Sequence, residues 1–281
     1  MNIKFRGEEK GVGSLFSYRS SKKTPDPFFV AAAIVLVVAC AVPAAAQSQQ
    51  LSSAACGSAP SVSGLFTGTA GNFAQLGSRA SLGIAAVGTV AALGAHRVDH
   101  EVTHSFTMSS TSSHDPFRPG AVIGGTPFQL GAAFATYAIG RALDKPCAAS
   151  LGADLVQAQL MAQVLAAGIK QATRRSRPEG SGYSFPSGHT SVAFASATVL
   201  QRHFGWKVGI PAYGVAAYVG ASRVEMNRHY LSDVAFGAAL GIIAGRTVTV
   251  GRGRQLMLTP LAPPDNAGTG AGIGFTWVGK H

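Results

Sequence analysis

Acidic residues are scarce in this 281-residue chain. It contains 12 Asp and Glu against 23 Lys and Arg, so only 12% of its residues are charged and its formal net charge is +11. Such an excess favours an anionic partner, which is a nucleic acid, an anionic membrane surface or a small anionic substrate. The chain lacks a basic stripe interleaved with aromatic residues, and we therefore expect no nucleic-acid partner.

Long, strongly apolar runs are also missing after residue 46. A run of 18 or more such residues is typical of a membrane-spanning helix. The later segments are instead diluted by Ala, Gly, Gln and Thr, and their small residues suit close helix packing in water or in a membrane. The sequence neither demands nor excludes a multi-span membrane protein, and we expect membrane association.

Residues 1–46 have the character of an export signal. A basic stretch precedes "FFVAAAIVLVVACAV" at residues 28–42, and "PAAAQ" then offers a cleavage site after Ala46. Residues 1–46 are therefore expected to be a signal peptide or an N-terminal anchor, with a lipoprotein-type processing site at Cys40 as a third interpretation. The predicted location is the periplasm or the outer face of the cell membrane.

Cysteine is rare, with three residues in the chain. Cleavage after Ala46 removes Cys40 and leaves Cys56 and Cys147. Two cysteines in an exported chain predict a disulfide, with two free thiols as the alternative.

The rest of the chain is predicted to be all-α. After a flexible lead-in (47–71), a helical domain is expected over 72–250, followed by a Gly/Pro-rich tail (251–281) with a short β-hairpin-like pattern. Gly, Pro and Ser clusters separate the helical segments. Six helices are expected, near 72–104, 124–143, 151–173, 187–203, 206–221 and 229–247.

One short stretch, "SFPSGHTS" at residues 184–191, has the composition of a helix start. Proline prepares the chain for a helix, and Ser and Gly are favoured N-cap residues. The first N–H groups of a helix lack partners within it and carry the positive end of its dipole. The stretch predicts either a simple cap with a surface histidine or a site for an anion such as phosphate.

Two other segments are expected at the same end of the bundle. Lys170 and Arg177 are seven residues apart and share a face if their helix continues to Pro178. A short loop makes the next helix an antiparallel neighbour, and the turn at "HFGW" returns the chain with "SRVEMNRHYLSD" at 222–233. The residues predicted to converge are Lys170, Arg177, Ser187, Gly188, His189, Arg223, His229 and Asp233.

The two histidines of this set differ in their expected partners. His229 and Asp233 are four residues apart, a helical spacing at which the carboxylate fixes the imidazole tautomer. Neutral His229 is therefore the candidate nucleophile for a phosphoryl group, and His189 the candidate acid for the leaving oxygen. The cations would neutralise the transferred group, so the scheme requires no metal.

These segments resemble the three signature motifs of the type 2 phosphatidic acid phosphatase family, which includes bacterial acid phosphatases and vanadium-dependent haloperoxidases. "KQATRRSRP", "PSGH" and "SRVEMNRHYLSD" match every defining position in order. The resemblance implies an all-α bundle and a phosphohistidine at His229, with His189 as acid and Asp233 as its orienting group. It also implies a phosphate held by Lys170, Arg177, Ser187, Gly188 and Arg223.

The expected function is an exported, metal-independent phosphatase for a phosphomonoester or pyrophosphate of a lipid or lipid-linked substrate. The expected partner is a phosphorylated lipid or a small phosphate ester. No cofactor is expected, although vanadate fits the same anion site. The alternatives are a vanadate-dependent haloperoxidase, a general periplasmic acid phosphatase and a non-catalytic anion-binding protein.

Two further groups have simpler interpretations. His96, His100 and His104 recur every four residues, a pattern that metal-site helices share, but a polar face at a helix end explains them equally well. Arg174 and Arg175 match no fixed motif position and are interpreted as a solvated helix face or as contacts to acidic headgroups.

Overall fold

The computed structural model describes residues 61–109, 117–250, 254–261 and 272–279. The predicted signal peptide or anchor, the lead-in before residue 61 and Cys56 lie outside these residues. Cys147 is disulfide-bonded, and its pairing with Cys56 stays a prediction.

The described residues form nine helices and two strands. The helices are α2 (Val62–Phe73), α3 (Arg79–His96), α4 (Asp99–Ser109), α5 (Arg118–Ile123), α6 (Thr126–Ala142), α7 (Pro146–Thr173), α8 (Gly188–Phe204), α9 (Trp206–Glu225) and α10 (Leu231–Val250). The strands β1 (Arg254–Leu261) and β2 (Gly272–Gly279) pair antiparallel, with Arg254 opposite Gly279. The predicted all-α class is confirmed for the bundle.

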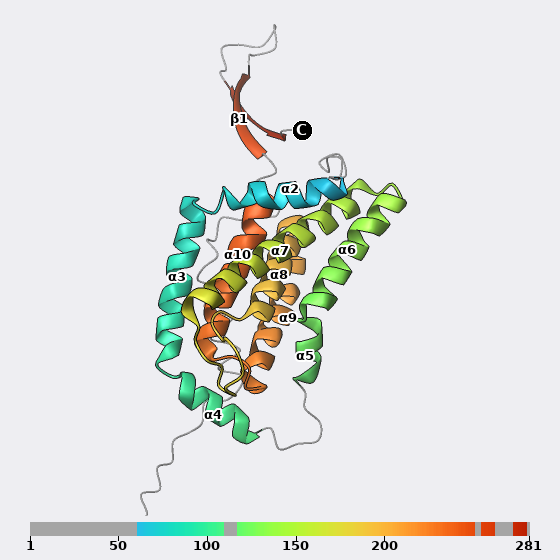
Figure 1. The fold of residues 1–281 in the computed structure, drawn as a ribbon. Coiled ribbons are helices and arrows are strands. Elements are labelled where there is room, and N and C mark those ends of the chain that lie inside the picture. The colour runs from blue at the N-terminus through green and yellow to red at the C-terminus, as the bar shows by residue number, and fades with distance from the viewer. Residues whose placement is uncertain (1–60, 110–116, 251–253, 262–271, 280–281) are drawn as a thin grey trace, which may run out of the picture.

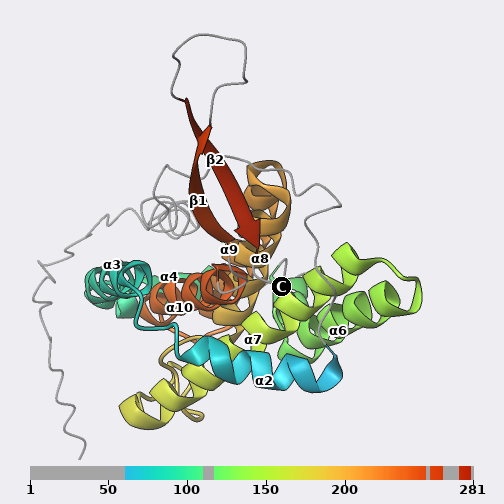
Figure 2. The same cartoon turned by 90° about the horizontal axis from the view of Figure 1, so that it is seen from above.

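Helix α10 lies at the centre of the bundle, between α3 on one side and α7 and α8 on the other (Figure 1, Figure 2). It is buried along most of its length because its own side chains are mostly apolar or small on every face. One part of the core joins α8, α9 and α10 through Phe194, Val219 and Val234, each fully buried. A second joins α7 to α8 and α10 through Met161, Val199 and Val248.

The N-terminal part of the bundle differs from the expectation in two places. The expected helix at 72–104 is broken, because α3 ends at His96 and α4 begins at Asp99. Part of the expected flexible lead-in is helical instead, since Ser61 caps α2 and Leu65 is buried beside Tyr137 and Ala153.

Three glycines of α10 bring this helix against α8. Gly237, Gly241 and Gly245 are spaced by four residues and form one helix face. A Cβ at Gly241 would overlap the carbonyl oxygen of Ser191, and one at Gly237 would lie 2.8 Å from the carbonyl oxygen of Ser187. Backbone atoms cannot move aside as a flexible side chain can, so only glycine permits this approach. The face places the start of α8 against the start of α10.

Replacing Gly241 is therefore predicted to destabilise the bundle. Gly241→Ala is expected to lower the free energy of unfolding by about 1–3 kcal/mol, the usual effect of overpacking. The matched control is Gly214→Ala on α9, where a Cβ meets nothing within 4 Å. That change is expected to stabilise by roughly 0.5–1 kcal/mol because alanine favours helix. Denaturant unfolding measures both, and equal effects of the two variants would contradict the close packing.

Candidate active site

The prediction that the helix of Lys170 continues to Pro178 is wrong. Lys170 and Arg177 lie close together, but they do not share a helix face. Helix α7 ends at Thr173, and Arg174 takes a left-handed conformation with φ 48°. The chain then folds into a loop in which Arg177 N–H donates to the Gly182 carbonyl at 3.3 Å. This loop supplies the backbone hydrogen bonds that a continued helix would have made.

Both cations are aimed at one backbone carbonyl. Lys170 Nζ and Arg177 Nε each donate to the carbonyl oxygen of Tyr183 at 3.2 Å. Lys170 also donates to the carbonyl oxygen of Ser184 at 2.8 Å. The loop between α7 and α8 therefore holds the two cations directly before the start of α8.

Ser187 is the N-cap of α8, as the sequence predicts. It is fully buried, and its Oγ accepts from Thr190 Oγ1 at 2.9 Å and from Thr190 N–H at 3.5 Å. Gly188 and His189 are the first two residues of the helix. The Ser187 N–H donates to the carbonyl oxygen of Asp233 at 3.0 Å, which ties the start of α8 to α10.

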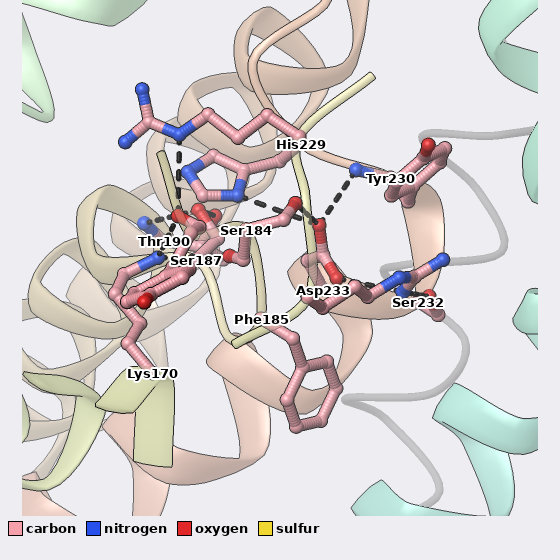
Figure 3. Close-up of polar contacts among 12 residues, drawn as sticks. Lys170, Ser184, Phe185, Ser187, Thr190, His229, Tyr230, Ser232 and Asp233 are labelled. Atoms are coloured by element: carbon pink, nitrogen blue, oxygen red, sulfur yellow. Dashed lines mark hydrogen bonds and ion pairs between the residues drawn. The ribbon is translucent and has the colours of Figure 1, made fainter. Parts of the chain in front are cut away.

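Asp233 lies in the first turn of α10 and is fully buried. Its Oδ2 accepts from the Tyr230 N–H at 2.8 Å and from the hydroxyl of Ser184. The bond to Tyr230 is the acidic half of a capping box, so helix geometry fixes the carboxylate. Figure 3 shows Ser184, His229 and Tyr230 gathered around this oxygen.

His229 lies two residues before α10, outside the helix that was expected to begin at 229, and is 3% exposed. Its Nδ1 lies 3.5 Å from Asp233 Oδ2, longer than a usual hydrogen bond. Such contacts are often loose before substrate binds. The Asp233 carboxylate thus faces Nδ1, and the other ring nitrogen, Nε2, takes no part in this contact.

The pKa values of both histidines are lowered to about 4. Burial is the main cause for each, because a charged imidazole loses its hydration there. For His229, Asp233 opposes this effect by raising the pKa, while the charge of Lys170 lowers it. For His189, the charges of Arg223 and His229 add to the lowering. Both rings are therefore neutral at pH 7 in the ligand-free site.

The carboxylate of Asp233 stays ionised despite its burial. Desolvation would raise its pKa, but the neighbouring His229 ring and hydrogen bonds from Ser184 and the Tyr230 N–H hold the pKa below the usual value. Burial and the charge of Arg177 lower the pKa of Lys170 to about 8, so this amine remains a cation at pH 7.

Arg223 is the third cation, at the end of α9 and 7% exposed. Burial, followed by the charges of Arg228 and Arg177, lowers its pKa to about 10. Its Nε is buried without a hydrogen-bond partner among the described residues. A buried donor without a partner is costly, and an anion bound beside it would satisfy it.

Arg175 corrects the sequence interpretation, because it is not part of a solvated face. Its Nη1 donates to Asp233 Oδ1 at 2.8 Å and to Ser232 Oγ at 2.6 Å. Its side chain is 23% exposed and its guanidinium lies 4.1 Å from the centre of the Tyr230 ring. Sequence reasoning missed it because its partners are on distant segments. Arg174, by contrast, is exposed as expected.

The histidine series at 96–104 is not one helical face. His96 ends α3, whereas His100 and His104 lie on α4 beyond the break. Among the described residues, no group of three or more His, Cys, Asp or Glu is arranged to hold a metal ion. His96 Nδ1 lies 3.0 Å from Asp99 Oδ2, and His100 packs edge-on against Tyr230.

Comparison with curated proteins finds lipid phosphatases. The chain is 41% identical over 99 residues to a lipid A 1-phosphatase of Porphyromonas gingivalis, covering 34% of this chain and 22% of that protein. It is 37% identical over 106 residues to a decaprenylphosphoryl-5-phosphoribose phosphatase of Mycobacterium tuberculosis, covering 34% of this chain and 58% of that protein. The matches thus span less than two thirds of either relative.

A solved structure and a family model also match. The transmembrane PAP2-type phosphatidylglycerolphosphate phosphatase of Bacillus subtilis aligns with a TM-score of 0.48 and 20% identity, over 67% of this chain and 94% of that one. The model of the PAP2 superfamily matches residues 159–256, which contain all three site-forming segments. The three segments therefore lie in the stretch of this chain that is similar to the PAP2 superfamily.

Proposed function

We propose that this chain is a metal-independent phosphatase that transfers a phosphoryl group first to His229 and then to water. The observation that carries the proposal is a neutral, buried His229 whose Nδ1 faces an ionised Asp233, beside three cations and the N-terminus of α8. Binding an anion requires only the cations. The oriented imidazole is what adds a nucleophile to the site.

The first step makes a phosphohistidine. Lys170, Arg177 and Arg223 hold the non-bridging oxygens, with the Ser187 hydroxyl and the Gly188 N–H as further donors. His229 Nε2 attacks phosphorus, the bond from phosphorus to the leaving oxygen breaks, and His189 gives that oxygen a proton. The phosphorylated ring is positive, and Asp233 stabilises it through the Nδ1 proton.

The second step releases phosphate. Neutral His189 takes a proton from a water molecule, whose oxygen attacks phosphorus while the phosphorus–Nε2 bond breaks. His229 returns to its neutral form, and His189 gives its proton to solvent when phosphate leaves, because the empty site lowers its pKa again. The cations neutralise charge in both transition states, so the scheme includes no metal. Vanadate, a tetrahedral anion, fits the same donors.

For the substrate, we propose a phosphorylated lipid or lipid-linked phosphate. The two curated relatives are named as phosphatases of lipid A and of a decaprenyl-linked sugar phosphate, which supports this class. Large apolar side chains are also exposed on the outer helices. They include Val90 on α3, Ile139 on α6 and Ile210 on α9, each more than half exposed.

We propose that these outer faces contact a membrane. In the described part of the chain, one helix is long and apolar enough to cross a bilayer, Leu231–Thr249, but 89% of that window is buried in the bundle. Core helices of soluble proteins pass the same test, so the exposed side chains are the stronger support. Together with the predicted signal at 1–46, they favour a position at the outer face of the cell membrane or in the periplasm.

The central prediction concerns phosphate release in the presence of EDTA. The full chain is expected to release phosphate from phosphatidic acid, from a polyprenyl diphosphate or from a small soluble ester, with the lipid substrates preferred. His229→Ala is expected to lower kcat by about 1000-fold or more because it removes the nucleophile. Colorimetric phosphate determination measures both.

His104→Ala is the matched control, since His104 is an exposed histidine of α4 outside the site. It is expected to keep wild-type activity. Release that depends on added metal, or that survives in His229→Ala, would overturn the proposal. Vanadate-dependent oxidation of bromide without phosphate release would show a haloperoxidase instead.

A second prediction follows from the lowered pKa of His189. Because the bare site holds this pKa at about 4, an acid role requires His189 to take up a proton when an anion neutralises the surrounding cations. Binding of sulfate at pH 6 is therefore expected to take up about one proton per anion. At this pH, Lys170, with its pKa of about 8, is already protonated and contributes little.

Calorimetric titration with sulfate in buffers of different ionisation enthalpy measures this uptake. Sulfate carries no proton at pH 6, so any uptake belongs to the protein. In His189→Ala the uptake is expected to fall to a small fraction of the wild-type value. Equal proton uptake in the two proteins would remove His189 from the acid role.

A further inference from the structure

A second buried carboxylate, Asp99, lies behind the candidate catalytic pair. It comes from the start of α4, outside the stretch that the family model matches, and it is fully buried. Its Oδ1 accepts from the Ser232 N–H at 2.9 Å and its Oδ2 accepts from the Ser232 hydroxyl at 2.6 Å. Asp99 therefore caps α10 from another helix, through Ser232, the residue that precedes Asp233.

Arg175 bridges the two carboxylates. One arm of its guanidinium reaches Asp233 Oδ1 at 2.8 Å, and the other reaches Asp99 Oδ2 at 2.7 Å. The planar fork of an arginine allows both contacts at once, and stacking on Tyr230 holds its plane. Arg175 thus holds Asp233 through Oδ1, while Oδ2 lies on the side of His229.

Asp99, Arg175 and Asp233 form a charged trio. Its charges explain how a second carboxylate affects the environment of His229. A guanidinium paired with Asp233 alone would cancel the negative charge that His229 Nδ1 faces. With Asp99 included, one cation lies between two anions and a net charge of −1 remains beside the imidazole. His96 Nδ1 also faces the trio, 3.0 Å from Asp99 Oδ2, but its side chain is 61% exposed. Water screens it far more than the buried groups.

We propose that Asp99 is a positioning residue for the phosphatase reaction. Acting through Arg175, it holds Asp233 in the orientation that keeps the proton of His229 on Nδ1 and leaves Nε2 free to attack. The inference rests on the proposed function and extends it, since Asp99 touches neither substrate nor reacting atoms. A purely structural Asp99 would hold α4 against α10 without affecting the state of the imidazole.

The test combines kinetics with a direct observation of His229. In the full chain, Asp99→Asn removes the charge and keeps the size of the side chain. It is expected to lower kcat about tenfold, as loss of an outer orienting partner typically does. KM is expected to stay within about twofold, because the phosphate donors are untouched. Nitrogen-15 NMR at pH 7, assigned with His229→Ala, is expected to show part of the Nδ1 proton moved to Nε2.

Glu101→Gln is the matched control, because it removes an exposed acidic charge from the same helix. It is expected to leave kcat, KM and the His229 signals unchanged. If Asp99→Asn does not fold, Arg175→Lys replaces it, since lysine keeps the charge but lacks the fork that reaches both carboxylates. The same loss of kcat and of the Nδ1 proton is expected there.

Wild-type signals of His229 in Asp99→Asn would overturn the positioning role, and so would a rise in KM at unchanged kcat. The NMR readout does not depend on turnover. If the wild-type chain releases no phosphate, the proposed function fails, while the position of the His229 proton still tests the link from Asp99.

Discussion

The carboxylate of Asp233 is the contact on which the arrangement of the site depends. It accepts hydrogen bonds from the loop before α8, from the backbone of Tyr230 just before α10 and from Arg175, and it faces His229. The backbone of the same residue receives the Ser187 N–H. One buried residue therefore connects the anion-binding helix start to the candidate nucleophile. Because it stays ionised, every donor around it is held by charge as well as by geometry.

This contact is available only because α8 and α10 lie unusually close together. The glycine face of α10 lets its backbone approach that of α8, and Gly237 lies directly beneath Ser187. A larger residue at that position would separate the N-cap from Asp233. Packing and chemistry are thus linked: the small residues that make the helices weakly apolar are the ones that bring the two helix starts together.

The sequence predicted the helical class and the cap of α8 because these depend on local patterns, namely periodicity and the "PSGH" stretch. It also indicated which segments meet, since short loops restrict where a helix returns. The structure places Lys170, Ser187 and Asp233 together accordingly. Their catalytic roles remain proposals.

Other features depended on contacts that no local pattern encodes. The end of α7 at Thr173 follows from hydrogen bonds within the loop at 175–184. The break between α3 and α4 at 97–98 contains no proline or glycine from which it could be predicted. Arg175 and Asp99 are 76 residues apart, and each is unremarkable in its own segment. An arginine held between two buried acids can be recognised only when the helices are assembled.

The most direct test of the account is to trap the phosphorylated enzyme. The full chain is mixed with a radiolabelled phosphate substrate, quenched within milliseconds under alkaline conditions that preserve phosphohistidine, and digested for mass spectrometry. The account predicts a phosphoryl group on His229, formed and lost at rates that match turnover. Phosphate release without any label on His229, or with the label on another residue, would contradict it.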